Sequence, residues 1–186
     1  MHLPTLLLLP ALAAAATSIP GYTIVPQLWE IEVAPGQIAT LNGTVQEVIA
    51  QAKAINPNYT LPDPPATVPR RRSQLSRREV KFCNNFGRAE IGPILEGVRY
   101  LKSLGGQASL GPGPGRCSRV SCSWDSAIYW CNDNTGSKSV TWDGLANSAA
   151  HITEVCPWVG SDQYQYVSGQ NFERTLWNTL VREDDC

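Results

Sequence analysis

The chain contains few of the residues from which metal and nucleic-acid sites are most often built. Two of its 186 residues are His and one is Met, which leaves little material for a His-built metal site. Fifteen Lys and Arg stand against 16 Asp and Glu, a net charge of −1, whereas proteins that bind nucleic acid by neutralising phosphates carry a basic excess. We therefore expect no metal, no cofactor and no nucleic-acid partner. With 42% hydrophobic and 17% charged residues, the chain should fold, as about one domain with appendages.

No apolar stretch has the length of a transmembrane helix. The stretch Leu3–Leu12 is shorter than the roughly 20 residues needed to cross a bilayer, and it runs into four alanines that offer a cleavage signal after Ala16. A buried helix of a cytosolic protein is the alternative, but Pro4 and Pro10 would break such a helix. Residues 1–16 therefore predict a signal peptide, and we expect the remainder to be secreted to the extracellular space.

Cysteine is absent from residues 17–78, and all six cysteines lie between Cys83 and Cys186. In an oxidising compartment an even number of cysteines is most simply interpreted as three disulfides. The cysteine-free segment instead carries two N-glycosylation sequons, at Asn42 and Asn58. We interpret residues 17–78 as a pro-segment that precedes the cysteine-rich region.

Two local signals organise this pro-segment. Thr44 and Glu47 have the spacing of a capping box, which predicts a short helix running through Lys53 and ended by the Asn-Pro pair at 56–57. Residues 61–69 are rich in proline, and this composition predicts an extended linker.

Five arginines follow the linker, and the last two are the pair Arg77 and Arg78. A solvated basic linker is one interpretation of this stretch. The other is a processing site for a kexin-type protease that cuts after Arg78, which we favour because the pair lies between a linker and the first cysteine. The mature protein would then be residues 79–186, whose 9 Lys and Arg and 12 Asp and Glu give a formal charge of −3.

Hydrophobic periodicity in residues 79–186 predicts two helices and four strands. The predicted elements are, in order, a strand at 80–83, a helix from Pro93 that ends before Gly105, strands at 117–124 and 127–131, a helix capped by Thr141 that ends before Pro157, and a closing strand at 172–181. Within the first hairpin strand, Val120, Cys122 and Trp124 are expected on one face. The order β-α-β-β-α-β predicts an α+β fold, a compact disulfide-stabilised sandwich of an antiparallel sheet with two helices on one face.

No catalytic signature is found in the predicted mature region. Its single histidine is His151, and Glu154, three residues further on, is expected to be a surface neighbour rather than a catalytic orienter. A carboxylate pair such as Asp125 with Asp133 could in principle serve a glycosidase. We expect the protein not to be an enzyme.

Aromatic residues are abundant in the same region. Trp158, Tyr164 and Tyr166 fall in the loop predicted at 157–170, where we expect them to be exposed. Because Tyr and Trp anchor partners with rigid, amphipathic side chains, these three residues are candidates for a binding surface.

The order of motifs from Cys117 onward resembles a known family. This is the killer-protein-four family, which is headed by the virally encoded killer toxin of smut fungi and includes killer-toxin-like effectors of filamentous fungi. The resemblance covers about residues 80–186 and rests mainly on cysteine placement. The motifs that carry it are Arg119-Val-Ser-Cys122, Asp125-Ser-Ala-Ile128-Tyr, a helix ending in Cys156, Gly160-Ser-Asp162 and a final strand closing at Cys186.

This resemblance implies a fold, a set of disulfides and a function. The fold is the same α/β-sandwich, and the implied pairs are Cys83–Cys156, Cys117–Cys131 and Cys122–Cys186, one of 15 possible connectivities. The implied function is that of a secreted toxin or effector. From export, processing, six cysteines, exposed aromatic residues and the lack of a catalytic signature, we expect it to bind a cell-surface or membrane target on a competing fungus or a host, to be a monomer and not to act as an enzyme. The alternatives are a small secreted cell-wall hydrolase using Asp125, Asp133 or Asp143, and a glycan-binding protein of the cell wall.

Overall fold

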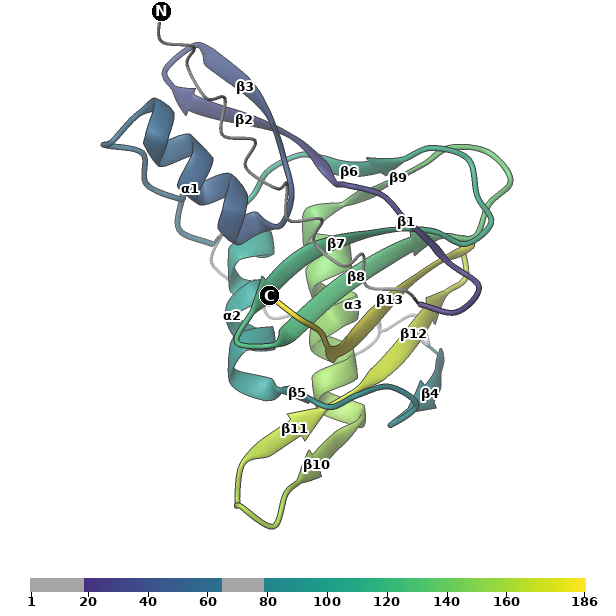
Figure 1. Cartoon of the computed structure of the whole chain (residues 1–186). Coiled ribbons are helices and arrows are strands. Elements are labelled where there is room, and N and C mark those ends of the chain that lie inside the picture. Colours follow the sequence, from purple (N-terminus) through teal and green to yellow (C-terminus); the bar gives the residue numbers. More distant parts are fainter. Residues whose placement is uncertain (1–18, 65–78) are drawn as a thin grey trace, which may run out of the picture.

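The computed structural model describes residues 19–64 and 79–186, which are arranged around a central sheet (Figure 1). The predicted cleavage point Ala16 and the predicted processing pair Arg77 and Arg78 lie outside the described residues, together with the second half of the proline-rich stretch. Within the described part of the chain, no helix is both long and apolar enough to cross a membrane.

Six strands form the central sheet. In spatial order they are β1 (Thr23–Ile24), β7 (Arg116–Ser123), β8 (Ser126–Asn132), β13 (Trp177–Glu183), β12 (Gly169–Glu173) and β4 (Glu79–Cys83). Neighbouring strands are antiparallel except β1 and β7, which are parallel. Helices α2 (Ile91–Lys102) and α3 (Trp142–Val155) lie side by side on one face of the sheet (Figure 1). The predicted α+β fold is thereby confirmed.

Helix α2 is amphipathic, as the spacing of its apolar residues predicts. Ile94, Val98 and Leu101 are buried, whereas Leu95 is largely exposed. A side chain at Gly97 would collide with the side chain of Ser121 in β7. The glycine therefore allows the helix to approach the sheet closely.

Helix α3 begins and ends where the sequence predicts. The hydroxyl of Thr141 accepts a hydrogen bond from the amide of Gly144 at 3.1 Å, which satisfies one of the amides left free at a helix N-terminus. Leu145, Ala149 and Ile152 are fully buried. The helix ends at Val155, just before Cys156.

The predicted closing strand at 172–181 is wrong, because the chain reverses within it. Strands β12 and β13 pair with each other in antiparallel fashion and are joined by a turn at residues 174–176. Leu176 in this turn has a φ of 58°, which no extended strand contains. The short polar pair Arg174-Thr175 is the only turn signal, and the strand-forming residues on both sides of it hide the reversal.

The described part of the cysteine-free segment, residues 19–64, is folded. Besides β1 it contains a hairpin of β2 (Leu28–Ala34) and β3 (Gln37–Asn42), followed by helix α1 (Val45–Ile55). The predicted capping box is present, since Thr44 N donates to Glu47 Oε2 at 2.6 Å and Glu47 N donates to Thr44 Oγ1 at 3.4 Å. The β2–β3 hairpin was not predicted.

Two smaller sheets complete the described structure. One contains β10 (Pro157–Val159), β11 (Gln165–Val167) and β5 (Ala89–Glu90), and the other contains β6 (Gln107–Leu110) and β9 (Lys138–Thr141). The predicted loop at 157–170 is therefore wrong, because most of it forms the β10–β11 hairpin and the start of β12. The three-residue strands are too short to show a period in the sequence.

Three disulfides cross-link residues 79–186, two of them between elements that are distant in the chain. Cys83–Cys156 ties the edge strand β4 to the end of α3, Cys117–Cys131 joins opposite residues of β7 and β8, and Cys122–Cys186 ties the β7–β8 hairpin to the C-terminus. These are the pairs that the family resemblance implies. Each bridge contributes roughly 2–4 kcal/mol to the free energy of unfolding.

Candidate binding surface

Strands β10 and β11 form an arm, residues 157–167, that projects from one end of the molecule (Figure 1). Trp158 and Tyr166 are opposite each other in its ladder. Their ring centroids are 5.8 Å apart with an interplanar angle of 46°, a separation typical of favourable aromatic pairs. We call this hairpin the aromatic arm.

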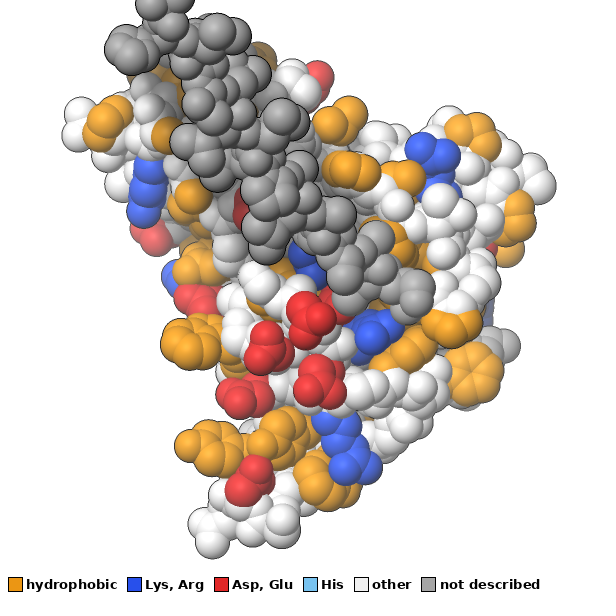
Figure 2. All heavy atoms as spheres, in the orientation of Figure 1, with side chains coloured by type: hydrophobic (Ala, Val, Ile, Leu, Met, Phe, Trp, Pro, Cys, Tyr) orange, Lys and Arg blue, Asp and Glu red, His pale blue; other side chains and the backbone are white. Residues whose placement is uncertain are grey.

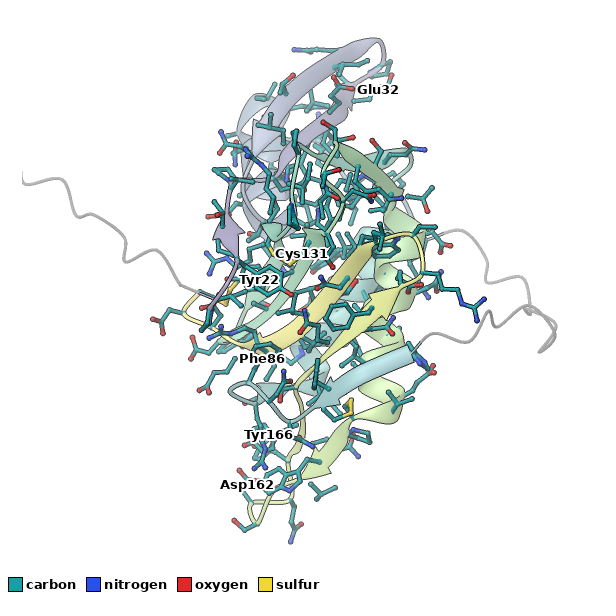
Figure 3. The ribbon with its side chains drawn as sticks, turned by 90° about the vertical axis from the view of Figure 1, so that its right-hand side faces the viewer. Tyr22, Glu32, Phe86, Cys131, Asp162 and Tyr166 are labelled. Atoms are coloured by element: carbon teal, nitrogen blue, oxygen red, sulfur yellow. A yellow bond between two sulfur atoms is a disulfide. The ribbon has the colours of Figure 1, made fainter. Side chains whose placement is uncertain are left out.

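A cation and a carboxylate hold the two rings in place. The guanidinium carbon of Arg88 lies 3.9 Å from the Trp158 ring centroid, within the range of a cation–π interaction. The Tyr166 hydroxyl donates to Asp162 Oδ2 at 2.6 Å, and Asp162 Oδ1 accepts from Tyr164 N at 3.1 Å. Figure 3 shows Tyr166 and Asp162 close together on the arm. The arm therefore presents its aromatic side chains in a fixed arrangement.

Electrostatics at this pair follow from the hydrogen bond. Donation to Asp162 stabilises the neutral phenol and raises the pKa of Tyr166 to about 12. The same bond stabilises the carboxylate and lowers the pKa of Asp162. At neutral pH the pair is therefore a phenol bonded to a carboxylate anion.

All three aromatic residues predicted as a binding surface lie on this arm. Trp158 is 37% exposed and Tyr164 is 63% exposed. Tyr166, which was also expected to be exposed, is partly buried and is opposite Glu90 of β5 in the ladder. The structure brings Trp158 and Tyr166 into contact. Tyr164 stands at the loop end of the hairpin, where its ring faces solvent.

The predicted position of a fourth aromatic residue, Trp124, is wrong. Trp124 does not share a face with Val120 and Cys122, because the register shifts between Arg119 and Ser121. Val120 packs in the core under the helices, Cys122 packs on the opposite face of the sheet, and Trp124 lies in the β7–β8 turn, 80% exposed.

The backbone at this turn is unusual for such a residue. Trp124 and Asp125 have φ values of 49° and 52°, the left-handed pair typical of tight hairpin turns that favour Asn-Gly. Bulky residues rarely adopt this conformation, which costs of order 1–3 kcal/mol per residue when strained. The tryptophan at this turn is therefore unfavourable for the backbone, which small residues adopt with less strain.

The turn and the aromatic arm adjoin through β5. Glu90 N donates to Ser126 Oγ at 3.0 Å, and Ser126 Oγ donates to Trp124 O at 3.0 Å, while Glu90 pairs with Tyr166 of the arm. Acidic and hydrophobic side chains gather on this end of the molecule (Figure 2). We define the aromatic surface as Trp124, Trp158, Tyr164 and Tyr166, and its exposed acidic neighbours are Glu90, Asp125, Glu183 and Asp185.

A buried polar cluster anchors the C-terminus beside this surface. The Asp184 side chain is fully buried, Tyr129 donates its hydroxyl hydrogen to it, and Arg119 Nη1 lies 3.3 Å from its Oδ2. Arg119 Nη1 also donates to the carbonyl of Asp185 at 2.7 Å. Arg119 of the Arg119-Val-Ser-Cys122 motif therefore holds the C-terminal residues against the sheet.

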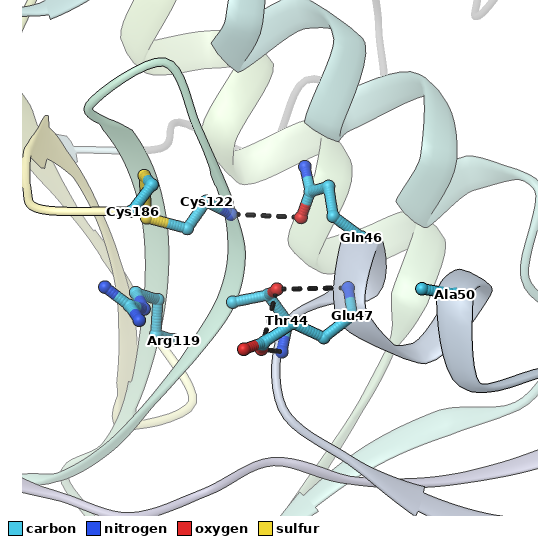
Figure 4. Close-up of a pocket in the computed structure, with 7 residues that line it drawn as sticks. All are labelled: Thr44, Gln46, Glu47, Ala50, Arg119, Cys122 and Cys186. Atoms are coloured by element: carbon cyan, nitrogen blue, oxygen red, sulfur yellow. Dashed lines mark hydrogen bonds between the residues drawn. A yellow bond between two sulfur atoms is a disulfide. The ribbon is translucent and has the colours of Figure 1, made fainter. Parts of the chain in front are cut away.

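A pocket of about 290 Å³ lies next to this cluster (Figure 4). It is lined by Arg119 and the Cys122–Cys186 disulfide on one side and by Gln46, Glu47 and other residues of α1 on the other. Two further pockets, of about 590 and 370 Å³, are likewise lined by residues of both 19–64 and 79–186. The three pockets therefore follow the boundary between the two regions.

The carboxylates considered for hydrolysis are not gathered into one site. Asp125 and Asp133 flank opposite ends of β8, which separates them by roughly 25 Å at the rise of a strand, whereas glycosidase pairs are about 5–9.5 Å apart. Asp133 accepts from Asn178 at 2.7 Å, and Asp143 accepts from Asn147 at 2.8 Å. His151 Nδ1 lies 3.7 Å from Glu154, its neighbour on α3.

Both predicted glycosylation sites lie on the surface of residues 19–64. Asn42, at the end of β3, and Asn58, just after α1, are both exposed on the cysteine-free segment. Among the described residues, no group of three or more His, Cys, Asp or Glu side chains could hold a metal ion.

No family model, no curated protein and no solved structure matches this chain.

Proposed function

We propose that the protein is a secreted effector of the killer-toxin type, which binds a target on the surface or membrane of another cell without catalysis. The observation that carries this proposal is the exposed aromatic surface, in which Trp158 and Tyr166 are held by Arg88 and Asp162. Large aromatic side chains dominate the energetics of protein interfaces. When they are already held in position, less conformational entropy is lost on binding.

Export is supported by composition and by the disulfides. Residues 1–16 have the apolar and small-residue pattern of a signal peptide. Three disulfides in a chain of this size are typical of proteins that work outside the cell.

The exposed Trp124 supports the same use of this end of the molecule. A tryptophan that is 80% exposed gains little from the folded core, and its left-handed backbone adds strain at the turn. Because this turn also adjoins the aromatic arm through β5, the Trp124 ring is in a position to contact the same partner as the arm.

The test is a dose–response assay of the purified protein on competing fungi and on plant cells. We expect growth inhibition or a cell response, and we expect Trp158→Ala and Trp124→Ala each to need at least tenfold more protein for the same effect. The matched control is Leu176→Ala. Leu176 is also exposed and has a φ of 58°, but it lies before the start of β13, away from the aromatic surface, so this variant should act like the parent. No response from any tested cell at micromolar dose would contradict the proposal.

The alternatives predict different results from the same material. A glycan-binding protein would be retained on chitin or glucan, with retention lost in Trp158→Ala. A hydrolase would release soluble sugars and would lose this activity on substitution of Asp125, Asp133 or Asp143.

A further inference from the structure

We propose that residues 19–64 stay bound to residues 79–186 as a non-covalent subunit after cleavage of the chain at Arg78. This proposal rests on the cleavage after Arg78 that the sequence predicts for the proposed secreted effector. The contacts that support it join the two regions on an edge and on both faces of the central sheet.

The first contact is a strand at the sheet edge. β1 pairs in parallel with β7, with Thr23 N donating to Gly115 O and Val25 N donating to Cys117 O, both at 2.8 Å. Ser118 Oγ donates to Val25 O at 2.8 Å. Without this segment, β7 would be the edge strand of the sheet, still paired with β8 but with free amides and carbonyls on its other side.

The close approach of the two backbones depends on one glycine. A Cβ at Gly115 would lie 2.9 Å from the carbonyl oxygen of Gly21, and the φ of Gly115 is +74°. Only glycine adopts such a backbone without strain while leaving room for a neighbouring chain. The sequence of residues 79–186 is therefore shaped to receive residues 19–64.

The second contact is a pair of stacked tryptophans. Trp29 of β2 and Trp142 of α3 have ring centroids 4.2 Å apart and an interplanar angle of 6°. They are 1% and 4% exposed, and both belong to the main hydrophobic core together with residues from both regions. Departure of residues 19–64 would expose the Trp142 ring to water, which is unfavourable.

The third contact is a set of side-chain hydrogen bonds across the boundary. Trp130 Nε1 donates to the buried Gln27 Oε1 at 2.9 Å. Gln46 Nε2 donates to Ser121 Oγ at 2.8 Å. Figure 4 shows the second bond of this side chain, in which Cys122 N donates to Gln46 Oε1 at 3.0 Å. Separation would leave these groups without their partners, and a buried group without a partner is costly.

The segment also covers the reverse face of the sheet. Ile19, Tyr22 and Ile24 pack against the cluster that contains Cys117, Tyr129 and Leu180. Gln170 Nε2 in β12 donates to the Tyr22 hydroxyl at 2.7 Å, and burial is the main cause of the raised pKa of Tyr22.

Cleavage after Arg78 would break none of these contacts. Because residues 17–78 contain no cysteine, the two pieces would share no disulfide and would separate in denaturant without reductant. The aromatic arm lies at the opposite end of the molecule from α1, β2 and β3 (Figure 1), so it would remain free in the two-chain protein.

The test uses the full chain in two forms. One form carries the natural sequence and is treated with a kexin-type protease, and the other has a site for a sequence-specific protease in place of residues 72–78. We expect each cut protein to show both pieces in one peak by size exclusion and one intact complex by native mass spectrometry. Residues 79–186 eluting alone would overturn the proposal. If only the engineered form is cut and its pieces stay together, the inference stands and the natural processing step fails.

Two variants locate the interaction. We expect Gln46→Ala to raise the dissociation constant of the two pieces of the cut protein at least tenfold, and Trp29→Ala to raise it further. Dilution followed by native mass spectrometry measures both constants. The matched control is Ile38→Ala, a residue of the same segment that is 70% exposed, which should not change dissociation. Equal dissociation of all three cut variants and the parent would contradict the interface. If Trp29→Ala does not fold, Gln46→Ala with its control still decides the question.

Discussion

Residues 79–186 are cross-linked by three disulfides. Residues 19–64 have none and contact residues 79–186 through packing and hydrogen bonds. The two regions nevertheless share one hydrophobic core and one sheet. The difference separates two kinds of stability. A disulfide acts mainly by restricting the unfolded chain, so it protects the region that contains it, while a packed segment contributes only as long as it remains in place.

Reduction of the disulfides should have the largest effect. Three bridges at roughly 2–4 kcal/mol each match the whole free energy of unfolding of a typical domain, about 5–15 kcal/mol. We expect the reduced protein to lose its cooperative thermal transition, as measured by near-ultraviolet circular dichroism with and without reductant. Removal of Cys117–Cys131, whose cysteines are 14 residues apart, should cost less than removal of Cys83–Cys156, which are 73 apart. An unchanged melting curve in reductant would contradict this.

The second prediction compares a buried and an exposed tryptophan, one from each region. Trp29→Ala should lower the free energy of unfolding by about 3–5 kcal/mol, because it leaves a cavity beside Trp142. Trp124→Ala should change it by less than about 0.5 kcal/mol, since the side chain is 80% exposed. Urea denaturation measures both values. Similar losses in the two variants would show that the segment containing Trp29 is not part of the cooperative core.

The third prediction compares two helix caps. Thr44 is buried and takes part in a reciprocal capping box, while Thr141 is exposed and makes a single cap bond. Loss of a threonine cap costs about 0.5–2 kcal/mol, so we expect Thr44→Ala near the upper end of this range and Thr141→Ala near the lower end. The matched controls are Thr44→Ser and Thr141→Ser, which keep the cap oxygen and should lose less. The opposite order in thermal melting would contradict the assignment.

The smallest effect concerns the pH dependence of the aromatic arm. The pKa of Tyr166 is raised to about 12 by the hydrogen bond to Asp162, so the contribution of this bond is complete below the ordinary tyrosine pKa of about 10 and is lost as the pH rises toward 12. The pKa of Asp162 is lowered, so the contribution is also lost as the pH falls through that depressed value.

An NMR titration of the Tyr166 ring tests this directly. In Asp162→Asn the pKa of Tyr166 should fall back toward 10, because the neutral amide no longer favours the neutral phenol. The control is Asp143→Asn, a change on α3 that should leave the Tyr166 titration as it is in the parent. An unchanged Tyr166 pKa in Asp162→Asn would show that the bond does not form in solution.

Elements with strong local signals were predictable from the sequence. The capping box at Thr44, the apolar period of α2 and the threonine cap of α3 all depend on residues within a few positions of one another. The β2–β3 hairpin also has a local signal, because polar and apolar residues alternate in Leu28–Ala34 and Pro35-Gly36 follows at the turn.

Three of the four members of the aromatic surface were predictable, but its geometry and the membership of Trp124 were not. Trp158, Tyr164 and Tyr166 stand out by type and by neighbouring turn residues. That Arg88, some 70 positions earlier in the chain, covers the Trp158 ring depends on how β5 pairs with β11. The placement of Val120 and Cys122 on opposite faces depends on a shift of register between Arg119 and Ser121, since a shift of one residue exchanges the two faces of a strand. Trp124 is exposed because it lies in the β7–β8 turn.

The sequence by itself determined the local elements, the separation of cysteine-rich from cysteine-free chain, and the acidic and aromatic character of residues 79–186. Only the tertiary structure decided that β1 completes the sheet edge at β7, that Trp29 stacks on Trp142, and that the arm adjoins the turn of Trp124. The physical reason is range. Caps and periodicity act within one or two turns of backbone, whereas edge pairing and ring stacking join residues about 90 to 115 positions apart, and their free energy appears only once the chain has folded.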